Sequence, residues 1–335
     1  MGRTAARSRG QDVVTPLPDG CGEAIEIGSV AGREPKAAAK AALDHFPELP
    51  SVPELPRKDP TEAILVRDLG PLAQIVRAAT LRTARPAGDA ALIRDLDEAD
   101  VAAGPEPAGF AAFLDALEAR RPRPLRVKVA VAGPVLLAQR VTDAAGRPLA
   151  SVPAAADAVA RYVVRRAVDL ASRLAAFGPT VVVQLDEPGT TDGLDTASFW
   201  RLSSVVGAIR MAGHLGAIHD CGARDGRKLL LIGPDLLLVD AWGVAVPFEA
   251  HGEALGGYLR GGGTVAWGVL PTKGVLPDPR KVARGVLDRM GAVAGDRDVV
   301  CRRGYVSPAC GFGASTLEFE RRARAALGIA RSAWR

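Results

Sequence analysis

Four residues that commonly bind metal ions each follow a short apolar run in the second half of the chain. His219 and Cys221 are two residues apart at the end of one run, Asp240 ends the next, and Cys310 comes after the last. Side chains two residues apart in an extended segment point to the same side, so His219 and Cys221 could reach one ion. Two thiolates, an imidazole and a carboxylate form a donor set typical of tetrahedral zinc. Because a lone His-x-Cys is also common in packed cores, the prediction depends on all four converging.

A second group of polar residues ends the strongest apolar run, in the motif Gln184-Leu185-Asp186-Glu187-Pro188. Two adjacent carboxylates at such a place suit the binding of a substrate ammonium group, or they work as an acid–base pair. The alternative is that they cap the N-terminus of the following helix, a position that favours acidic side chains. We take Asp186 as the candidate catalytic residue and both acids as candidate substrate ligands.

The apolar runs that carry these residues are short, rich in Val, Ile and Leu, and continuous, as expected of strands buried on both faces of a parallel sheet. They alternate with segments of helical spacing. The expected strands cover residues 24–29, 49–55, 125–131, 180–185, 217–219, 236–239, 265–269 and 305–307. The expected helices include residues 64–81, 110–119, 155–177, 198–212, 279–293 and 315–333.

Eight strands that alternate with helices predict an α/β fold, a (β/α)8 TIM barrel, in which the carboxyl ends of the strands meet at the catalytic face. The alternative is an open doubly wound sheet, but no Gly-x-Gly-x-x-Gly or Walker pattern follows any expected strand. Residues 1–22 are polar and rich in Gly and Arg, so we expect a flexible arm there. A single barrel domain is expected over residues 23–335.

Composition narrows the class of protein. The chain has 335 residues, of which 48% are hydrophobic, and this argues against a mainly disordered chain. No run approaches about 18 uninterrupted apolar residues, and the N-terminus lacks the apolar part of a secretory signal, so we expect a cytoplasmic protein that spans no membrane. The net charge of +5 comes from scattered arginines with only 4% aromatic residues, which argues against a nucleic-acid partner.

In their order along the chain, these motifs resemble those of the cobalamin-independent methionine synthases. The resemblance is to the C-terminal catalytic zinc barrel of that family, in a compact single-domain form, and it runs over about residues 24–330. It is carried by five motifs: Ile27-Gly28-Ser29, Gly133-Pro134, Gln184-Leu185-Asp186-Glu187-Pro188, His219-x-Cys221 and Cys310-Gly311. It implies the barrel architecture that this family shares with uroporphyrinogen decarboxylase.

The resemblance implies a zinc-dependent methyltransferase that makes methionine from homocysteine. The family's zinc ligands correspond here to His219, Cys221, Asp240 and Cys310. Its homocysteine-binding residues correspond to Gly28, Ser29, Glu54, Asp186 and Glu187. Zinc would stabilise the homocysteine thiolate at neutral pH, and this thiolate would attack the methyl group of a donor.

Departures from the family bear on the metal and on the methyl donor. The acidic zinc ligand is Asp240 where the family has glutamate, which is one methylene longer. The loop at residues 270–274 contains Thr272 and Lys273 but no histidine that could protonate a folate. We also expect no counterpart of the family's N-terminal barrel, which helps to bind folate. The donor is therefore either methyltetrahydrofolate or a corrinoid, including a corrinoid protein.

Alternative functions stay open beside this one. A related thiol methyltransferase could use a corrinoid or another donor, a decarboxylase of the same architecture would need no zinc, and a non-catalytic barrel could bind metal alone. Metal content separates the decarboxylase from the others. Methyl transfer from a panel of donors separates the enzymes from the non-catalytic barrel.

Overall fold

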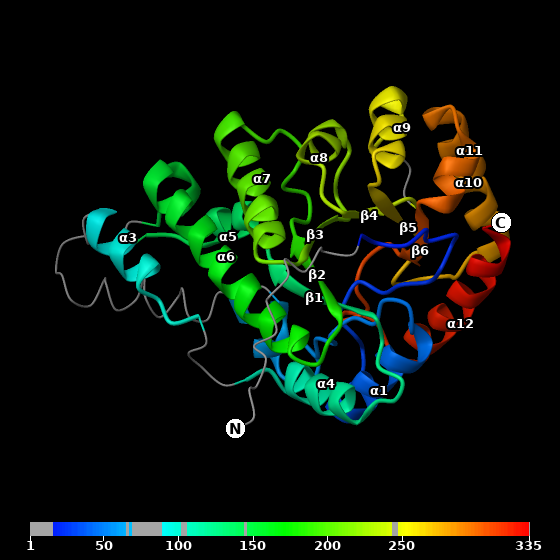
Figure 1. Cartoon of the computed structure of the whole chain (residues 1–335), viewed down its shortest axis with the longest axis horizontal. Helices are drawn as coiled ribbons and strands as arrows, with labels where there is room; N and C mark the ends of the chain where they lie inside the picture. The colour runs from blue at the N-terminus through cyan, green and yellow to red at the C-terminus, as the bar shows by residue number, and fades with distance from the viewer. Residues whose placement is uncertain are drawn as a thin grey trace, which may run out of the picture.

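The fold centres on one parallel sheet of six strands. The computed structural model describes residues 16–64, 67–68, 89–101, 106–143, 146–242 and 247–334. Neighbouring strands are consecutive in the chain, and every pair is parallel. The strands, drawn in Figure 1, are β1 (Arg126–Ala132), β2 (Thr180–Asp186), β3 (Leu215–Asp220), β4 (Leu236–Asp240), β5 (Thr264–Leu270) and β6 (Gly304–Pro308).

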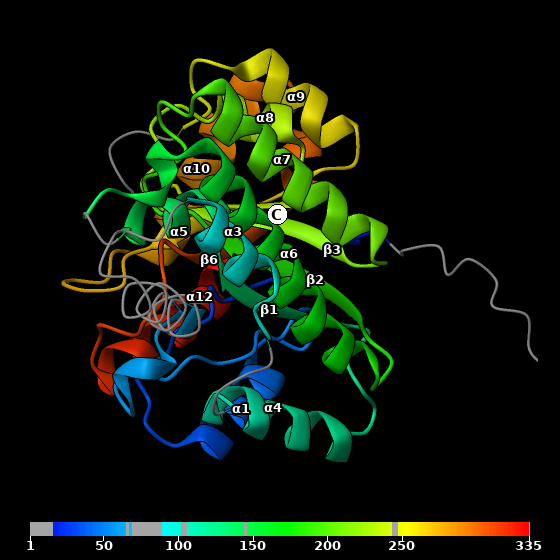
Figure 2. The same cartoon turned by 90° about the vertical axis from the view of Figure 1, so that its left-hand side faces the viewer.

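Helices connect the strands and lie around the outside of the sheet (Figures 1 and 2). Several begin where proline supports a first turn, and aspartates cap others. The α-helices are α1 (Pro35–His45), α3 (Asp89–Asp97), α4 (Ala108–Ala119), α5 (Pro134–Arg140), α6 (Pro153–Ala175), α7 (Thr196–Met211), α8 (Arg227–Ile232), α9 (Gly252–Arg260), α10 (Pro279–Ala294), α11 (Arg297–Arg302) and α12 (Leu317–Ala333). Two short 3₁₀ helices are η1 (Pro60–Glu62) and η2 (Leu149–Ser151).

The closed eight-stranded TIM barrel expected from the sequence is wrong, because the described residues form six parallel strands in an open half-barrel. The expected strands at 24–29 and 49–55 make only isolated parallel bridges, which pair Ala24 with Val306, Ser29 with Glu54, and Ser51 with Lys128. Proline explains part of the difference, since Pro50 and Pro53 have no N–H to donate to a ladder. Gly28, with φ of 153°, adopts a backbone conformation that favours glycine and departs from a regular strand.

These N-terminal segments fill the inner face of the half-barrel. Leu17, Ile25, Ile27 and Leu49 are buried there with strand residues such as Leu238. The other face of the sheet packs on the helices in a larger core. Burial on both faces explains why the strands have continuous apolar sequences. The apolar character of the N-terminal segments therefore predicted burial correctly, but not pairing in a ladder.

The expected helices agree with the structure wherever it describes them. The helices expected at 110–119, 155–177, 198–212, 279–293 and 315–333 correspond to α4, α6, α7, α10 and α12. The helix expected at 64–81 lies mostly outside the described residues, as do residues 1–15 of the expected arm. Within the described end of that arm, Cys21 and Gly22 donate backbone hydrogen bonds to Arg302 and Gly304, so this end is held against the fold. None of the described helices is both long and apolar enough to cross a membrane.

Candidate metal centre

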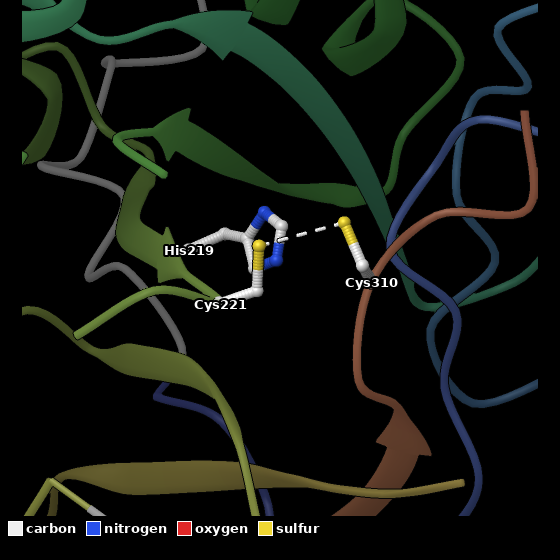
Figure 3. A group of neighbouring side chains, drawn as sticks. All are labelled: His219, Cys221 and Cys310. Carbon is white, nitrogen blue, oxygen red and sulfur yellow. Dashed lines mark hydrogen bonds between the residues drawn. The ribbon is translucent and has the colours of Figure 1, made fainter. Parts of the chain in front are cut away.

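Three of the four expected metal ligands come together at the carboxyl ends of the strands. One donor atom each from His219, Cys221 and Cys310 lies within 4.8 Å of the other two. The Sγ atoms of Cys221 and Cys310 are 3.5 Å apart. Figure 3 shows the two sulfurs facing each other, with the ring of His219 beside them. The chain therefore contains a group that could hold a metal ion.

The curved sheet and one close backbone approach bring Cys310 to this place. His219 lies in β3 and Cys221 directly follows it, whereas Cys310 follows β6, three strands away. Directly before Cys310, the N–H of Ala309 donates a hydrogen bond to Leu270 O at 2.8 Å, which fixes the start of this segment. Beyond Cys310, a Cβ added to Gly311 would lie 2.0 Å from Ser29 Oγ, so any side chain there would have to displace the Ser29 hydroxyl.

One ring nitrogen of His219 interacts with Asp186, and the other is available to a metal ion. Its Nδ1 lies 3.2 Å from Oδ1 of Asp186, its register partner on β2. Its side chain is buried, and among the described residues Nε2 has no hydrogen-bond partner. A carboxylate on one nitrogen with the metal on the other is the usual arrangement of a metal-binding histidine. An orphaned buried nitrogen beside two thiols is the feature that a metal ion would satisfy.

The donors fit a tetrahedral ion with one open position. Two sulfurs bound to one zinc at about 2.3 Å in tetrahedral geometry would be about 3.8 Å apart. The sulfurs of Cys221 and Cys310, at 3.5 Å, are close to that separation. Two thiolates and one imidazole make three protein ligands, and three is the number found in catalytic zinc sites, where the fourth position takes water or substrate.

The three donors hold different numbers of protons in the absence of metal. A hydrogen bond donated by the Cys221 thiol lowers the pKa of Cys310 to about 4. The same hydrogen bond, together with burial, raises the pKa of Cys221. Burial acts to lower the pKa of His219, but the Asp186 carboxylate outweighs it and holds that pKa well above 6.5. These shifts favour one thiolate, one thiol and one imidazolium in the metal-free site.

Asp240, the fourth expected ligand, does not join this group. It lies at the end of β4 on the same side as Leu236 and Leu238, which face the inner core. However, its Oδ1 accepts a hydrogen bond from the N–H of Trp242 at 2.8 Å. This local turn is one that a short aspartate side chain favours. Placement at a strand end therefore predicted the correct edge of the sheet, but not the direction of the carboxylate.

The expected substrate residues Gly28, Ser29, Glu54 and Asp186 lie beside the metal group. Ser29 pairs with Glu54 in an isolated bridge, and its backbone O accepts a hydrogen bond from Phe312, two residues beyond Cys310. Among the described residues, Gln184 Nε2 and His219 Nδ1 both interact with Oδ1 of Asp186. The Asp186 side chain is 14% exposed. The Oδ2 atom is therefore available to a ligand.

Glu54 is a buried acid with an unsatisfied oxygen. Its Oε1 has no hydrogen-bond partner among the described residues and lies 3.7 Å from Nη1 of Arg67. Burial raises the pKa of Glu54 to about 8, against the opposing effect of Arg67, and the nearby Asp186 carboxylate raises it further. Arg67 is thus the cationic group that pairs with this oxygen, while a hydrogen-bond donor to it is missing among the described residues.

Glu187, expected to bind substrate, has a carboxylate that accepts hydrogen bonds from the protein instead. Its carboxylate accepts hydrogen bonds from the N–H groups of Val135 and Leu136, both at 2.8 Å, and from Thr190 Oγ1 at 2.6 Å. A Cβ on Gly133 would lie 2.2 Å from Glu187 Oε1, so the chain needs glycine where it approaches this acid. Glu187 therefore caps the N-terminus of α5, which precedes it in the chain, and not the following helix considered in the sequence analysis.

Two buried polar residues near the site had no role in the sequence interpretation. Lys128 lies in the middle of β1 with no exposed surface, and Gln184 precedes Asp186 on β2, also fully buried. The signal for Lys128 was a lysine inside the apolar run 125–131, since lysine is almost never fully buried unless it is paired. Gln184 belonged to a motif in which only the acids were given roles.

Comparisons with known proteins provide no family for this chain. No protein-family model and no curated protein matches it. An apo structure of endo-beta-N-acetylglucosaminidase from Cordyceps militaris shares 14% identity over 72% of this chain and 78% of that one, with a TM-score of 0.33. The carboxyl transferase domain of Rhizobium etli pyruvate carboxylase shares 12% identity over 67% and 43%, with a TM-score of 0.27. Nitroalkane oxidase from Streptomyces ansochromogenes shares 12% identity over 94% and 98%, with a TM-score of 0.27. Such low TM-scores support no argument about function.

Proposed function

We propose that this protein is a zinc-dependent methyltransferase that transfers a methyl group to the thiol of homocysteine and forms methionine. The observation that carries the proposal is the group of His219, Cys221 and Cys310, with a buried Nε2 that has no hydrogen-bond partner among the described residues and lies beside the two cysteines. Three protein donors leave a fourth position for a substrate sulfur. The resemblance of the motifs to the cobalamin-independent methionine synthases supports the choice of reaction.

The side chains around the metal group suit an amino acid that carries a thiol. When bound, zinc supplies a Lewis acid that lowers the pKa of a thiol and holds its sulfur. Asp186 Oδ2 and Glu54 Oε1 are acceptors for the substrate ammonium group, because neither accepts a hydrogen bond within the described residues, although Glu54 Oε1 also lies 3.7 Å from Nη1 of Arg67. The hydroxyl of Ser29, which is partly exposed, is a donor for the substrate carboxylate.

The reaction exchanges one bond to carbon for another. The thiol loses its proton, its sulfur forms a bond to the methyl carbon, and the bond from that carbon to the donor breaks. The electron pair of the broken bond leaves with the donor. A folate nitrogen needs a proton to leave in this way, whereas a methylcorrinoid does not. In the loop after β5, Lys273 is exposed and no histidine is present, which favours a donor that needs no acid.

The test combines metal analysis with methyl transfer. Protein purified without chelator should contain about one zinc per chain, and with homocysteine it should form methionine from methylcobalamin faster than from monoglutamyl methyltetrahydrofolate. Cys310→Ser should lose both zinc and activity, whereas Cys301→Ser, which changes a cysteine outside the group, should keep both. Zinc-loaded protein that transfers no methyl group from folate, corrinoid or sulfonium donors would contradict the proposal. A folate rate equal to the corrinoid rate would contradict the choice of donor.

A further inference from the structure

Lys128 is a buried cation whose contacts lead toward the metal group. It lies in the middle of β1, and its side chain has no exposed surface. Its Nζ lies 2.5 Å from Ile27 O, 2.9 Å from Ser51 Oγ and 2.6 Å from Gln184 Oε1. An ammonium group has three N–H donors, and here each has one acceptor. Burying a lysine is costly, and packing alone does not require this one.

The contact with Lys128 decides which way the Gln184 amide faces. An ammonium group can only donate, so Gln184 must turn its oxygen toward Lys128. Its Nε2 then faces Asp186 and donates to Oδ1 at 2.6 Å. This order of donors and acceptors would fail if the amide were reversed, because two donors would then meet at Lys128 and two acceptors at Asp186.

The same Asp186 oxygen orients His219. A carboxylate can only accept, so the ring nitrogen 3.2 Å from Oδ1, which is Nδ1, must carry a proton. In neutral imidazole a proton on Nδ1 leaves the lone pair on Nε2. This is the buried nitrogen without a hydrogen-bond partner in the described part of the chain, beside Cys221 and Cys310.

We propose that Lys128 is a positioning residue that acts through Gln184 and Asp186 to present Nε2 of His219 to a metal ion. All four side chains lie on strands β1, β2 and β3 and belong to the inner side of the sheet, where they alternate with outward-facing residues such as Val129, Leu185 and Ile218. The inference rests on the metal binding that the proposed function requires, but not on methyl transfer.

The deciding variant is Gln184→Glu, which leaves Lys128 and its contacts with Ile27 and Ser51 in place. Glutamate can pair with Lys128, but its second oxygen faces Asp186 as another acceptor and repels it. Outer contacts of this kind are typically worth about 10–100-fold in metal affinity. We expect Gln184→Glu and Lys128→Met to weaken zinc binding by about that factor, measured by competition with a chelator.

Ser51→Ala is the matched control, because it removes a partner of Lys128 that leads away from the metal group. It should lower stability while leaving zinc affinity unchanged. The spectroscopic readout is the Nδ1–H of His219 in zinc-loaded protein labelled with 15N at its four histidines. This proton should exchange slowly in the unchanged protein and in Ser51→Ala, and rapidly in Gln184→Glu.

Two outcomes separate this inference from the proposed function. Folded Gln184→Glu protein with unchanged zinc affinity and a protected Nδ1–H would overturn the positioning role of Lys128. Weakened zinc binding in that variant, in a protein that transfers no methyl group to homocysteine, would support the positioning role and remove the proposed function.

Discussion

At the scale of single residues, the protonation of His219, Cys221 and Cys310 determines how the metal group binds an ion. The hydrogen bond from Cys221 lowers the pKa of Cys310 and raises that of Cys221, which favours a thiolate on Cys310 and a thiol on Cys221. The Asp186 carboxylate outweighs the effect of burial and raises the pKa of His219, which favours the imidazolium. A metal ion needs deprotonated ligands, so it must displace the two remaining protons.

Zinc binding at pH 7 should therefore release about two protons per chain, one from Cys221 and one from Nε2 of His219. The count is obtained by titration calorimetry in buffers that differ in ionisation enthalpy. Affinity should fall as pH decreases below neutral, since more protons then compete with the metal. Release of three protons would mean that Cys310 is a thiol in the metal-free protein.

Glu54 offers a second prediction at this scale, on substrate binding. A charge-assisted hydrogen bond to the substrate ammonium is worth roughly 1.5–3 kcal/mol, so Glu54→Gln should weaken homocysteine binding by about 10–150-fold. Because the pKa of Glu54 is raised to about 8, its carboxyl group must lose a proton before it pairs with the ammonium. Affinity should thus rise from pH 6 to pH 8 more steeply in the unchanged protein than in Glu54→Gln.

The measurement is the dissociation constant of homocysteine for zinc-loaded protein at several pH values. Zinc content should be unchanged in Glu54→Gln, because Glu54 is not one of the three donors. Equal homocysteine affinities for both proteins across this range would remove Glu54 from the substrate site.

At the scale of elements, the start of α5 illustrates how a buried acid joins two elements. Glu187, directly after β2, accepts hydrogen bonds from the first N–H groups of α5, which directly follows β1. Burial is the main reason that the pKa of Glu187 is raised from 4.5 to about 7, although the hydrogen bonds from Thr190 and the helix act against it. A cap in this form connects the ends of two neighbouring strands.

This raised pKa makes stability depend on pH. The folded protein binds more protons than the unfolded chain between about pH 4.5 and 7, so the contribution of Glu187 is fully present below pH 4.5 and is lost as pH rises toward 7. In Glu187→Gln this loss is absent. The free energy of unfolding of the unchanged protein relative to the variant should fall by up to about 3 kcal/mol over this range.

The check is urea unfolding of both proteins at pH 4.5, 5.5 and 7.5. Thr190→Ser keeps a hydroxyl donor to Glu187 and serves as the control, with the same pH dependence as the unchanged protein. A constant difference between Glu187→Gln and the unchanged protein would show that Glu187 titrates normally.

At the scale of the whole molecule, the metal group depends on two segments that are distant in sequence. The segment around Ser29 lies against the one that follows Cys310, with Gly311 directly beside the Ser29 hydroxyl. The half-barrel therefore positions Cys310 through the N-terminal segment as well as through β6. A change at this contact should be transmitted to the metal group.

Gly311→Ala is expected to push these segments apart, because its Cβ would displace the Ser29 hydroxyl and also lie only 3.2 Å from Ser29 Cβ and 3.3 Å from Ser29 O. Overpacking of this kind costs about 1–3 kcal/mol, and the displaced Cys310 should weaken zinc binding. Gly285→Ala is the control, since this exposed glycine in α10 has open space around it and should change stability by no more than about 1 kcal/mol in the stabilising direction. Thermal unfolding and chelator competition measure both effects; zinc affinity unchanged in Gly311→Ala would refute the link.

The sequence alone determined which apolar runs would be buried and which polar residues would end the strands. Continuous apolar runs predicted the six strands of the sheet, because burial on both faces demands them. Parallel strands bring their carboxyl ends to one edge, and for this reason the order of runs and polar residues was enough to group His219, Cys221 and Cys310. Local spacing also predicted the principal helices around the sheet.

Tertiary structure decided what local pattern does not encode. The runs at 24–29 and 49–55 are as apolar as strands, but prolines and the backbone of Gly28 leave them with isolated bridges, so the sheet has six strands. Asp240 ends a strand as a ligand would, yet its short side chain turns back to Trp242. The path from Lys128 to His219 joins three strands, and hydrogen bonds between residues so distant in sequence exist only once the sheet has formed.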